Sequence, residues 1–97
     1  MKVVGIIWLR HVVDKLAWKH GLSTDEVEQV FSSAPRFRHM EAGDVDGEDL
    51  YAALGRTAAG RYLIVFFVYK ASNEALIVSA RDMIRKERKG YGRKARA

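Results

Sequence analysis

The sequence contains no cysteine, and that absence excludes three classes of site. Disulfide bonds, zinc sites built on thiolates and cysteine nucleophiles all need the missing side chain. Small secreted domains usually depend on disulfides for their stability, so a cysteine-free chain of 97 residues is typical of a protein that stays inside the cell. The sequence therefore predicts a cytoplasmic location.

Long hydrophobic runs are missing as well. The longest uninterrupted apolar stretch covers residues 62–69, far short of the roughly 20 residues that cross a bilayer as a helix. The first residues hold one lysine before a short apolar run, and no small-residue cleavage site follows, so we expect no signal peptide and no membrane partner. The length indicates one domain, expected over residues 1–91, with a basic C-terminal tail over 92–97.

Motifs for metal and phosphate chemistry are also lacking. The three histidines, His11, His20 and His39, show no metal-ligand spacing, and the acidic loop 41–49 lacks the alternating ligands of a calcium loop. No glycine-rich phosphate loop and no Gly-x-Ser-x-Gly elbow occurs. We therefore expect no cofactor and no metal.

Positive charge is concentrated at the C-terminal end of the chain. The formal net charge is +5, and residues 81–97 alone hold eight Lys and Arg against two acids. Such a cluster attracts nucleic-acid phosphates, acidic proteins or anionic lipid. The alternative is that it is an ordinary solvated tail.

Residue patterns predict the order of helices and strands. A short strand over 3–8 precedes a helix that begins near residue 10 and ends at Gly21. Ser23 and Glu26 have the spacing of a capping box for a second helix, which ends before Pro35, the only proline. Four further strands are expected over 36–40, 50–56, 61–70 and 75–80, and a helix over 81–91.

This order indicates the α+β fold class, with N-terminal helices packed on an antiparallel β-sheet and a basic C-terminal helix. The strand over 61–70 is apolar on both faces, so both faces of the sheet need a cover. Its aromatic residues, Tyr62, Phe66, Phe67 and Tyr69, could stack on bases, although an apolar strand more often belongs to the core.

Arginines are the best candidates for chemistry. Arg56 and Arg61 flank one turn, and Arg81, Arg85 and Lys89 would form one basic stripe on a helix. If the strands that carry Arg56 and Arg81 are neighbours, these two guanidiniums could approach one another and bind a phosphodiester. Two ordinary alternatives are that Arg56 pairs with an acid of the preceding loop, Glu48 or Asp49, and that the stripe is solvated.

Several short motifs follow one another along the chain. The stretch 53–57 (ALGRT) and Gly60-Arg61 precede the apolar strand, and 77–81 (IVSAR), 86–88 (KER) and Tyr91 come after it. Upstream, 19–21 (KHG) precedes an acidic helix, and 47–51 (GEDLY) leads into a strand. In their order and spacing these motifs resemble the BrnT family of toxins, over roughly residues 8–91.

The resemblance implies a RelE-like fold and a ribonuclease toxin of a type II toxin–antitoxin pair, which cuts RNA without a metal and inhibits translation. Its partners would be RNA, in some cases on the ribosome, and a small, acidic, DNA-binding antitoxin. Carried onto this chain, the catalytic candidates are Arg56, Arg81, His20 and Lys19. The RNA-binding candidates are Arg61, Arg85, Arg88 and Lys89.

The chain departs from the family pattern at two positions. Leu9 stands where members often have Asp after Trp, and Leu50 stands where they often have Arg, which removes one phosphate contact. These departures indicate a divergent branch. They keep open an alternative function, a non-catalytic module that binds RNA or an acidic protein on the same fold. For Lys19 and His20, the alternative to proton transfer is a role at the end of a helix.

Overall fold

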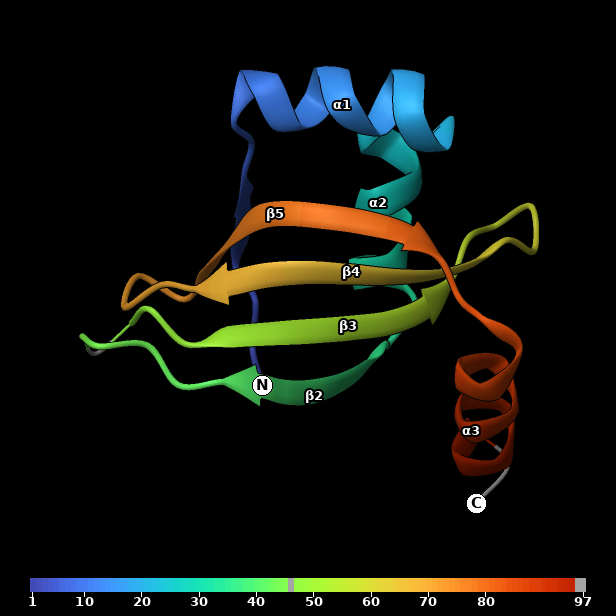
Figure 1. Cartoon of the computed structure of the whole chain (residues 1–97). Helices are drawn as coiled ribbons and strands as arrows, with labels where there is room; N and C mark the ends of the chain where they lie inside the picture. Colours follow the sequence, from blue (N-terminus) through green and yellow to red (C-terminus); the bar gives the residue numbers. More distant parts are fainter. Residues whose placement is uncertain (46, 96–97) are drawn as a thin grey trace.

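The computed structural model describes residues 1–45 and 47–95, and this part of the chain contains five strands and three helices (Figure 1). The strands are β1 (Gly5–Ile7), β2 (Arg36–Glu41), β3 (Leu50–Arg56), β4 (Tyr62–Tyr69) and β5 (Glu74–Asp82). The helices are α1 (Arg10–His20), α2 (Thr24–Ser32) and α3 (Arg85–Ala95). None of the helices in these ranges is long and apolar enough to cross a membrane.

All five strands belong to one sheet, in the order β1–β5–β4–β3–β2. Strands β2 to β5 pair antiparallel with one another, whereas β1 pairs parallel with β5. The predicted α+β class is confirmed, but the sheet is mixed and not wholly antiparallel. Short connections dictate the direction of β3, β4 and β5, while β1 leaves the sheet through two helices, and a connection of that length permits parallel pairing.

Helix α1 ends and helix α2 begins at the capping residues that the sequence predicts. Gly21 terminates α1 in the left-handed conformation at φ 60°, after Lys19 and His20 in the last turn. At the start of α2, the Ser23 hydroxyl accepts the Glu26 N–H at 3.2 Å and the Glu26 carboxylate accepts the Ser23 N–H at 3.1 Å. This tight corner brings both helices onto the same face of the sheet (Figure 1).

The main core lies between that helical layer and the sheet. Phe67 of β4 is fully buried at its centre, and its ring meets those of Phe31 and Phe37 edge-on at 5.3 and 5.9 Å between ring centroids. The fully or almost fully buried members from the helical layer are Val12, Leu16, Leu22, Val27 and Val30. Those from the sheet are Ala53, Leu63, Val65, Phe67, Ala75, Ile77 and Ala80.

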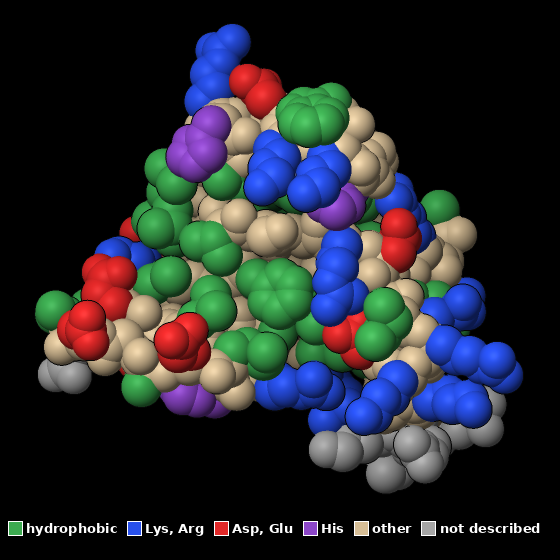
Figure 2. Space-filling view, in the orientation of Figure 1, with side chains coloured by type: hydrophobic (Ala, Val, Ile, Leu, Met, Phe, Trp, Pro, Cys, Tyr) green, Lys and Arg blue, Asp and Glu red, His purple; other side chains and the backbone are tan. Residues whose placement is uncertain are grey.

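The opposite face of the sheet is covered at one end only. There α3 packs over a smaller cluster of buried residues, Ala52, Leu54, Ile64 and Met83. Figure 2 views this face, and hydrophobic side chains gather over the central strands while Lys and Arg side chains crowd around α3 at the lower right. The predicted need for a cover on both faces is therefore only partly met within the described residues.

The boundary between the last strand and the last helix differs from the prediction. Arg81 and Asp82 pair with Ile64 and Leu63 of β4, so β5 extends through Asp82 and α3 begins at Arg85. The Glu87 carboxylate accepts the N–H of Ile84 at 2.9 Å, which caps the helix there. The helix continues to Ala95, past the expected end at residue 91, and residues 96–97 of the predicted tail lie outside the described residues.

Candidate functional site

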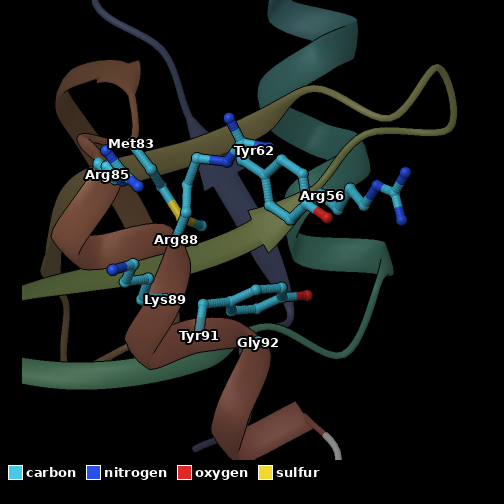
Figure 3. Close-up of a pocket in the computed structure, with 8 residues that line it drawn as sticks. All are labelled: Arg56, Tyr62, Met83, Arg85, Arg88, Lys89, Tyr91 and Gly92. Carbon is cyan, nitrogen blue, oxygen red and sulfur yellow. The ribbon is translucent and has the colours of Figure 1, made fainter.

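A cavity of about 800 Å³ opens between α3 and the end of the sheet where β3 and β4 meet their connecting turn (Figure 3). We call it the α3 pocket. The sheet and the segment after β5 contribute Arg56, Tyr62 and Met83, and α3 contributes Arg85, Arg88, Lys89, Tyr91 and Gly92. Arg56 and Tyr62 lie opposite one another in the antiparallel register, which places both side chains on the α3 side of the sheet.

Tyr62 organises the cations of this pocket. The guanidinium carbon of Arg88 lies 4.4 Å from the Tyr62 ring centroid and that of Arg56 lies 5.0 Å from it. Tyr91 meets the same ring edge-on at 6.1 Å, and both phenolic hydroxyls point toward the side on which Arg56 lies (Figure 3). Cation–π contacts of this kind hold an arginine in place without consuming its N–H donors.

The α3 pocket is strongly positive. Four of its lining residues carry a fixed positive charge, and none of those in the described part of the chain is acidic. The Arg56 side chain makes no hydrogen bond or ion pair with any described residue, and its contact is with the Tyr62 ring, so its guanidinium donors remain available to a ligand. A site with several cations, open N–H donors and two aromatic rings suits a phosphate group attached to a base.

Arg81 lies on the same face of the sheet but does not line the α3 pocket. Its guanidinium donates to both oxygens of Glu87, at 2.8 and 3.0 Å, and so ties β5 to the first turn of α3. That pairing raises the pKa of Arg81 and lowers the pKa of Glu87. Since β4 separates β3 from β5, the condition under which Arg56 and Arg81 would approach one another is not met.

Arg61 lies on the other side of the sheet, although only four residues separate it from Arg56. It donates to Asp82 at 2.7 and 3.0 Å, to Glu26 at 3.3 Å, and to the carbonyls of His20 and Gly21 at 2.9 and 3.0 Å. These five hydrogen bonds use all five N–H donors of the guanidinium. The hydrogen bonds to Asp82 raise the pKa of Arg61 most, and Arg61 in turn lowers the pKa of Asp82.

The other predicted site residues divide between the two sides. Arg85, Arg88 and Lys89 line the α3 pocket, but the expected stripe loses Arg81, which belongs to β5 and not to the helix. Lys19 and His20 form the last turn of α1 and do not line the pocket. The described residues contain no group of three or more His, Asp or Glu side chains that could hold a metal ion.

A second cavity, of about 230 Å³, lies at the opposite end of the sheet and is a weaker candidate. Among the described residues that line it, Lys70 is the one cation, and Lys70 is paired with the carboxylate of Glu48. Asp49 accepts hydrogen bonds from His39 and from the Gly43 N–H, and these lower the pKa of Asp49. Both acids are therefore engaged within the protein, and the predicted alternative of an ion pair with Arg56 is wrong for each.

Two aromatic residues, Tyr62 and Tyr91, also line the α3 pocket. Sequence reasoning named Tyr62 as a residue that could stack on bases, but it gave no site role to Tyr91. For Tyr62 the signal is local, because the tight turn over 57–60 makes Arg56 and Tyr62 a pair at the turn end of the hairpin. For Tyr91 the sequence held no such signal, because its position depends on how α3 docks against the sheet.

Comparisons with known proteins agree with this geometry. The family model described as "Ribonuclease toxin, BrnT, of type II toxin-antitoxin system" matches residues 11–87. Among solved structures, the 1.1 Å crystal structure of the Brucella abortus ribonuclease toxin BrnT is similar in fold, with a TM-score of 0.65 and 23% sequence identity over 84% of this chain and 97% of that one. No curated protein sequence matches the chain. Because the family match covers most of its length, the chain belongs to the BrnT family of ribonuclease toxins of type II toxin–antitoxin systems.

Proposed function

We propose that this protein cleaves RNA in the α3 pocket without a metal ion, and that this cleavage inhibits translation in the cytoplasm. The observation that carries the proposal is the set of four cations, Arg56, Arg85, Arg88 and Lys89, around two tyrosines with no acid among the described lining residues. A phosphodiester is the ligand that such a site attracts most strongly. The pocket is open to solvent at one end of the sheet, where a single strand can enter (Figure 3).

The reaction that fits this pocket is attack of a ribose 2′-oxygen on the adjacent phosphorus. The 2′-O–P bond forms while the bond from phosphorus to the 5′-oxygen breaks, which leaves a 2′,3′-cyclic phosphate and a 5′-hydroxyl. Arg56 and Arg88 stabilise the charge that develops on the phosphate oxygens. The 2′-hydroxyl proton leaves and a proton reaches the 5′-oxygen, and the lining groups able to transfer protons are Tyr62, Tyr91 and Lys89.

The remaining predicted residues receive supporting roles in this proposal. Arg81 is a positioning residue, because its pairing with Glu87 holds α3 against the sheet. Arg61 stabilises the corner between α1 and α2, since none of its donors is left for RNA. Lys19 and His20 lie outside the pocket and take no step in the proposed reaction.

The type II family implies a cognate antitoxin. The concentration of positive charge around α3 favours an acidic partner, and we extend the proposal to a small antitoxin that also binds DNA. Binding to the ribosome would deliver messenger RNA to the pocket in an extended conformation.

The deciding experiment is inducible expression in a bacterial host, with growth, total RNA and incorporation of labelled amino acids followed together. The wild type should stop growth and incorporation while RNA is cut, and Arg56→Ala/Arg88→Ala should lose all three effects while staying folded. The matched control is Arg10→Ala/Lys15→Ala, which removes two exposed cations from α1 and should remain toxic. Persistent toxicity of the folded pocket variant would show that the site lies elsewhere.

Purified protein separates the remaining possibilities. Cleavage of a single-stranded RNA should continue in excess EDTA, and loss of cleavage there, restored by a divalent cation, would contradict metal independence. RNA that is bound tightly but stays intact would support the alternative, a non-catalytic binding module on the same fold.

A further inference from the structure

The positive surface continues from the α3 pocket across the adjacent face of the sheet. The antiparallel register places side chains from four strands in rows across this face. One row consists of Arg36, Leu54, Ile64 and Arg81, and the next consists of Arg38, Ala52, Phe66 and Ser79. Helix α3 buries the middle of the first row, where Leu54 and Ile64 are only 1% exposed, and leaves the second row at its margin.

Phe66 is the large side chain of that second row. Its neighbours in the row, Ala52 and Ser79, are small, so the half-buried Phe66 ring stands above them. The guanidinium of Arg81 lies 5.5 Å from the ring centroid. A phenyl ring with a planar cation against it, open on a sheet face, is a surface on which a nucleic-acid base stacks.

Arg38 provides the charge next to this ring. It lies on β2, at the edge of the sheet, and its side chain makes no hydrogen bond or ion pair with another described residue. Its charge nevertheless acts on Glu87, whose pKa it lowers together with Arg81 and the Ile84 N–H. Glu87 is already bound to Arg81, and its side chain is only 13% exposed, so Arg38 keeps its donors for a ligand.

The positive surface has a definite end. In the following row, Leu50, Val68 and Leu76 are apolar, and the acid Glu41 lies beside Leu50. Glu74 follows on the same face of β5. Figure 2 shows this gradient, with acidic side chains at the left and Lys and Arg side chains at the lower right.

We propose that Phe66 and Arg38 form a second RNA subsite, which binds nucleotides of the same strand a short distance from the cleaved phosphate. Phe66 stacks on a base, and Arg38 binds the backbone beside it. Phe66 lies four residues along β4 from Tyr62, or about 13 Å, which a few nucleotides of single strand can bridge. This inference rests on the proposed function, because the subsite places RNA whose scissile phosphate lies in the α3 pocket.

The test measures binding of two fluorescent 2′-O-methyl RNAs, an octanucleotide and a trinucleotide, by anisotropy. The 2′-O-methyl groups remove the attacking hydroxyl, so neither probe is cut. We expect Phe66→Leu to weaken octanucleotide binding about tenfold and to leave trinucleotide binding unchanged, because only the longer strand reaches the ring. Arg38→Gln should weaken octanucleotide binding and lower its salt dependence by about one ion.

Two variants guard against a general loss of structure. Phe66→Tyr keeps the aromatic ring and should retain octanucleotide binding. Trp18→Leu removes an aromatic side chain that is 77% exposed on α1, on the other side of the sheet, and should have no effect.

The outcomes separate this inference from the proposed function. Equal weakening of both probes by Phe66→Leu, or weakening of neither while wild-type protein binds and cuts RNA, would overturn the subsite and leave the pocket intact. Failure of the wild type to bind either probe would overturn both proposals. If Phe66→Leu weakens only neutralisation by the antitoxin, this part of the sheet binds the protein partner and not RNA.

Discussion

Arg56 and Arg61 flank the same turn, yet they face opposite sides of the sheet and have opposite surroundings. The Arg61 guanidinium donates all of its N–H groups, to Asp82, to Glu26 and to two carbonyls at the corner between α1 and α2. Arg56 has no such partner among the described residues and rests on the Tyr62 ring. The difference shows that charge alone does not mark a functional arginine. What marks it is the number of donors that the fold leaves unused.

The same contrast holds for the two sides of the sheet as a whole. On the side of α1 and α2, Arg61 pairs with both Glu26 and Asp82, and the core is complete. On the side of α3, cations outnumber acids and the cover is partial. The first side stabilises the fold. On the second side, cations with unused donors can bind an anion. The predictions below test this division, from the largest expected effect to the smallest.

The largest effect is expected for Arg56→Met. Loss of one guanidinium that stabilises the developing phosphate charge should lower kcat/KM for RNA cleavage about 100-fold or more. The free energy of unfolding should change by less than about 0.5 kcal/mol, because the Arg56 side chain has only its contact with the Tyr62 ring to lose, and no hydrogen bond or ion pair with a described residue. Cleavage kinetics and urea unfolding of the same preparation check both parts. If Arg56→Met loses stability and keeps its cleavage rate, Arg56 stabilises the fold and does not act on RNA.

Arg61→Met should show the opposite pattern. Removing the guanidinium leaves Asp82, Glu26 and two carbonyls without their donor, which should lower the free energy of unfolding by about 2 kcal/mol and the Tm by about 10 °C. The rate of the folded protein should stay close to that of the wild type. Thermal melts and cleavage assays well below the Tm check this, and Arg56→Met is the matched control. A large loss of RNA affinity in the folded variant would mean that Arg61 contacts RNA after all.

Acid should act mainly through Glu87 and Asp82. Both carboxyls have a folded-state pKa below the ordinary value, because Arg81 and Arg61 bind the charged forms. Below the ordinary value of 4.5 for Glu or 3.8 for Asp, the unfolded chain therefore binds more protons than the folded one. Stability from these pairs is complete above that range and is lost as the pH falls through the folded-state pKa.

Glu87→Gln tests which pair matters more. Glu87 is 13% exposed whereas Asp82 is 59% exposed, so solvent screens the Asp82 pair more strongly. Urea unfolding between pH 7 and 3 should show a shallower acid loss in Glu87→Gln than in the wild type, and Asp82→Asn should change that slope less. An unchanged slope in Glu87→Gln would mean that the link between β5 and α3 adds nothing to stability.

Local signals in the sequence predicted much of the fold. Gly21 after Lys19-His20, and Ser23 with Glu26, fix the ends of α1 and α2 by bonds within a few residues. The uninterrupted apolar run predicted strand β4 nearly to the residue. The start of α3 was placed four residues early, because pairing of Arg81 and Asp82 with β4 is a non-local interaction that outweighs helical spacing.

The candidate site was only partly predictable. Sequence clustering identified Arg56, Arg85, Arg88 and Lys89, which meet in the α3 pocket. It could not separate Arg61 from them, because the bonds to Asp82 and to the α1–α2 corner join positions about 20 to 40 residues apart. Nor could it single out Arg38 or show that Arg38 lies beside Phe66, a residue already named for base stacking, because the two share a row only once the strands are in register.

The smallest effect concerns the salt dependence of RNA binding, and it sharpens the contrast between the cations of the α3 pocket and those on the other side of the sheet. If the four cations of the α3 pocket each contact a phosphate of single-stranded RNA, log K against log salt should have a slope of about −3. Arg85→Ala/Lys89→Ala should reduce the magnitude of the slope by about 1.4. It should weaken binding of many sequences about equally, because backbone contacts carry no sequence information. The comparison is with Arg10→Ala/Lys15→Ala, which removes the same charge from α1 and should keep the wild-type slope. If both double variants lower the slope equally, RNA responds to the net charge of the protein and not to the pocket, and the distinction between the two sides of the sheet would fail for binding even if it holds for cleavage.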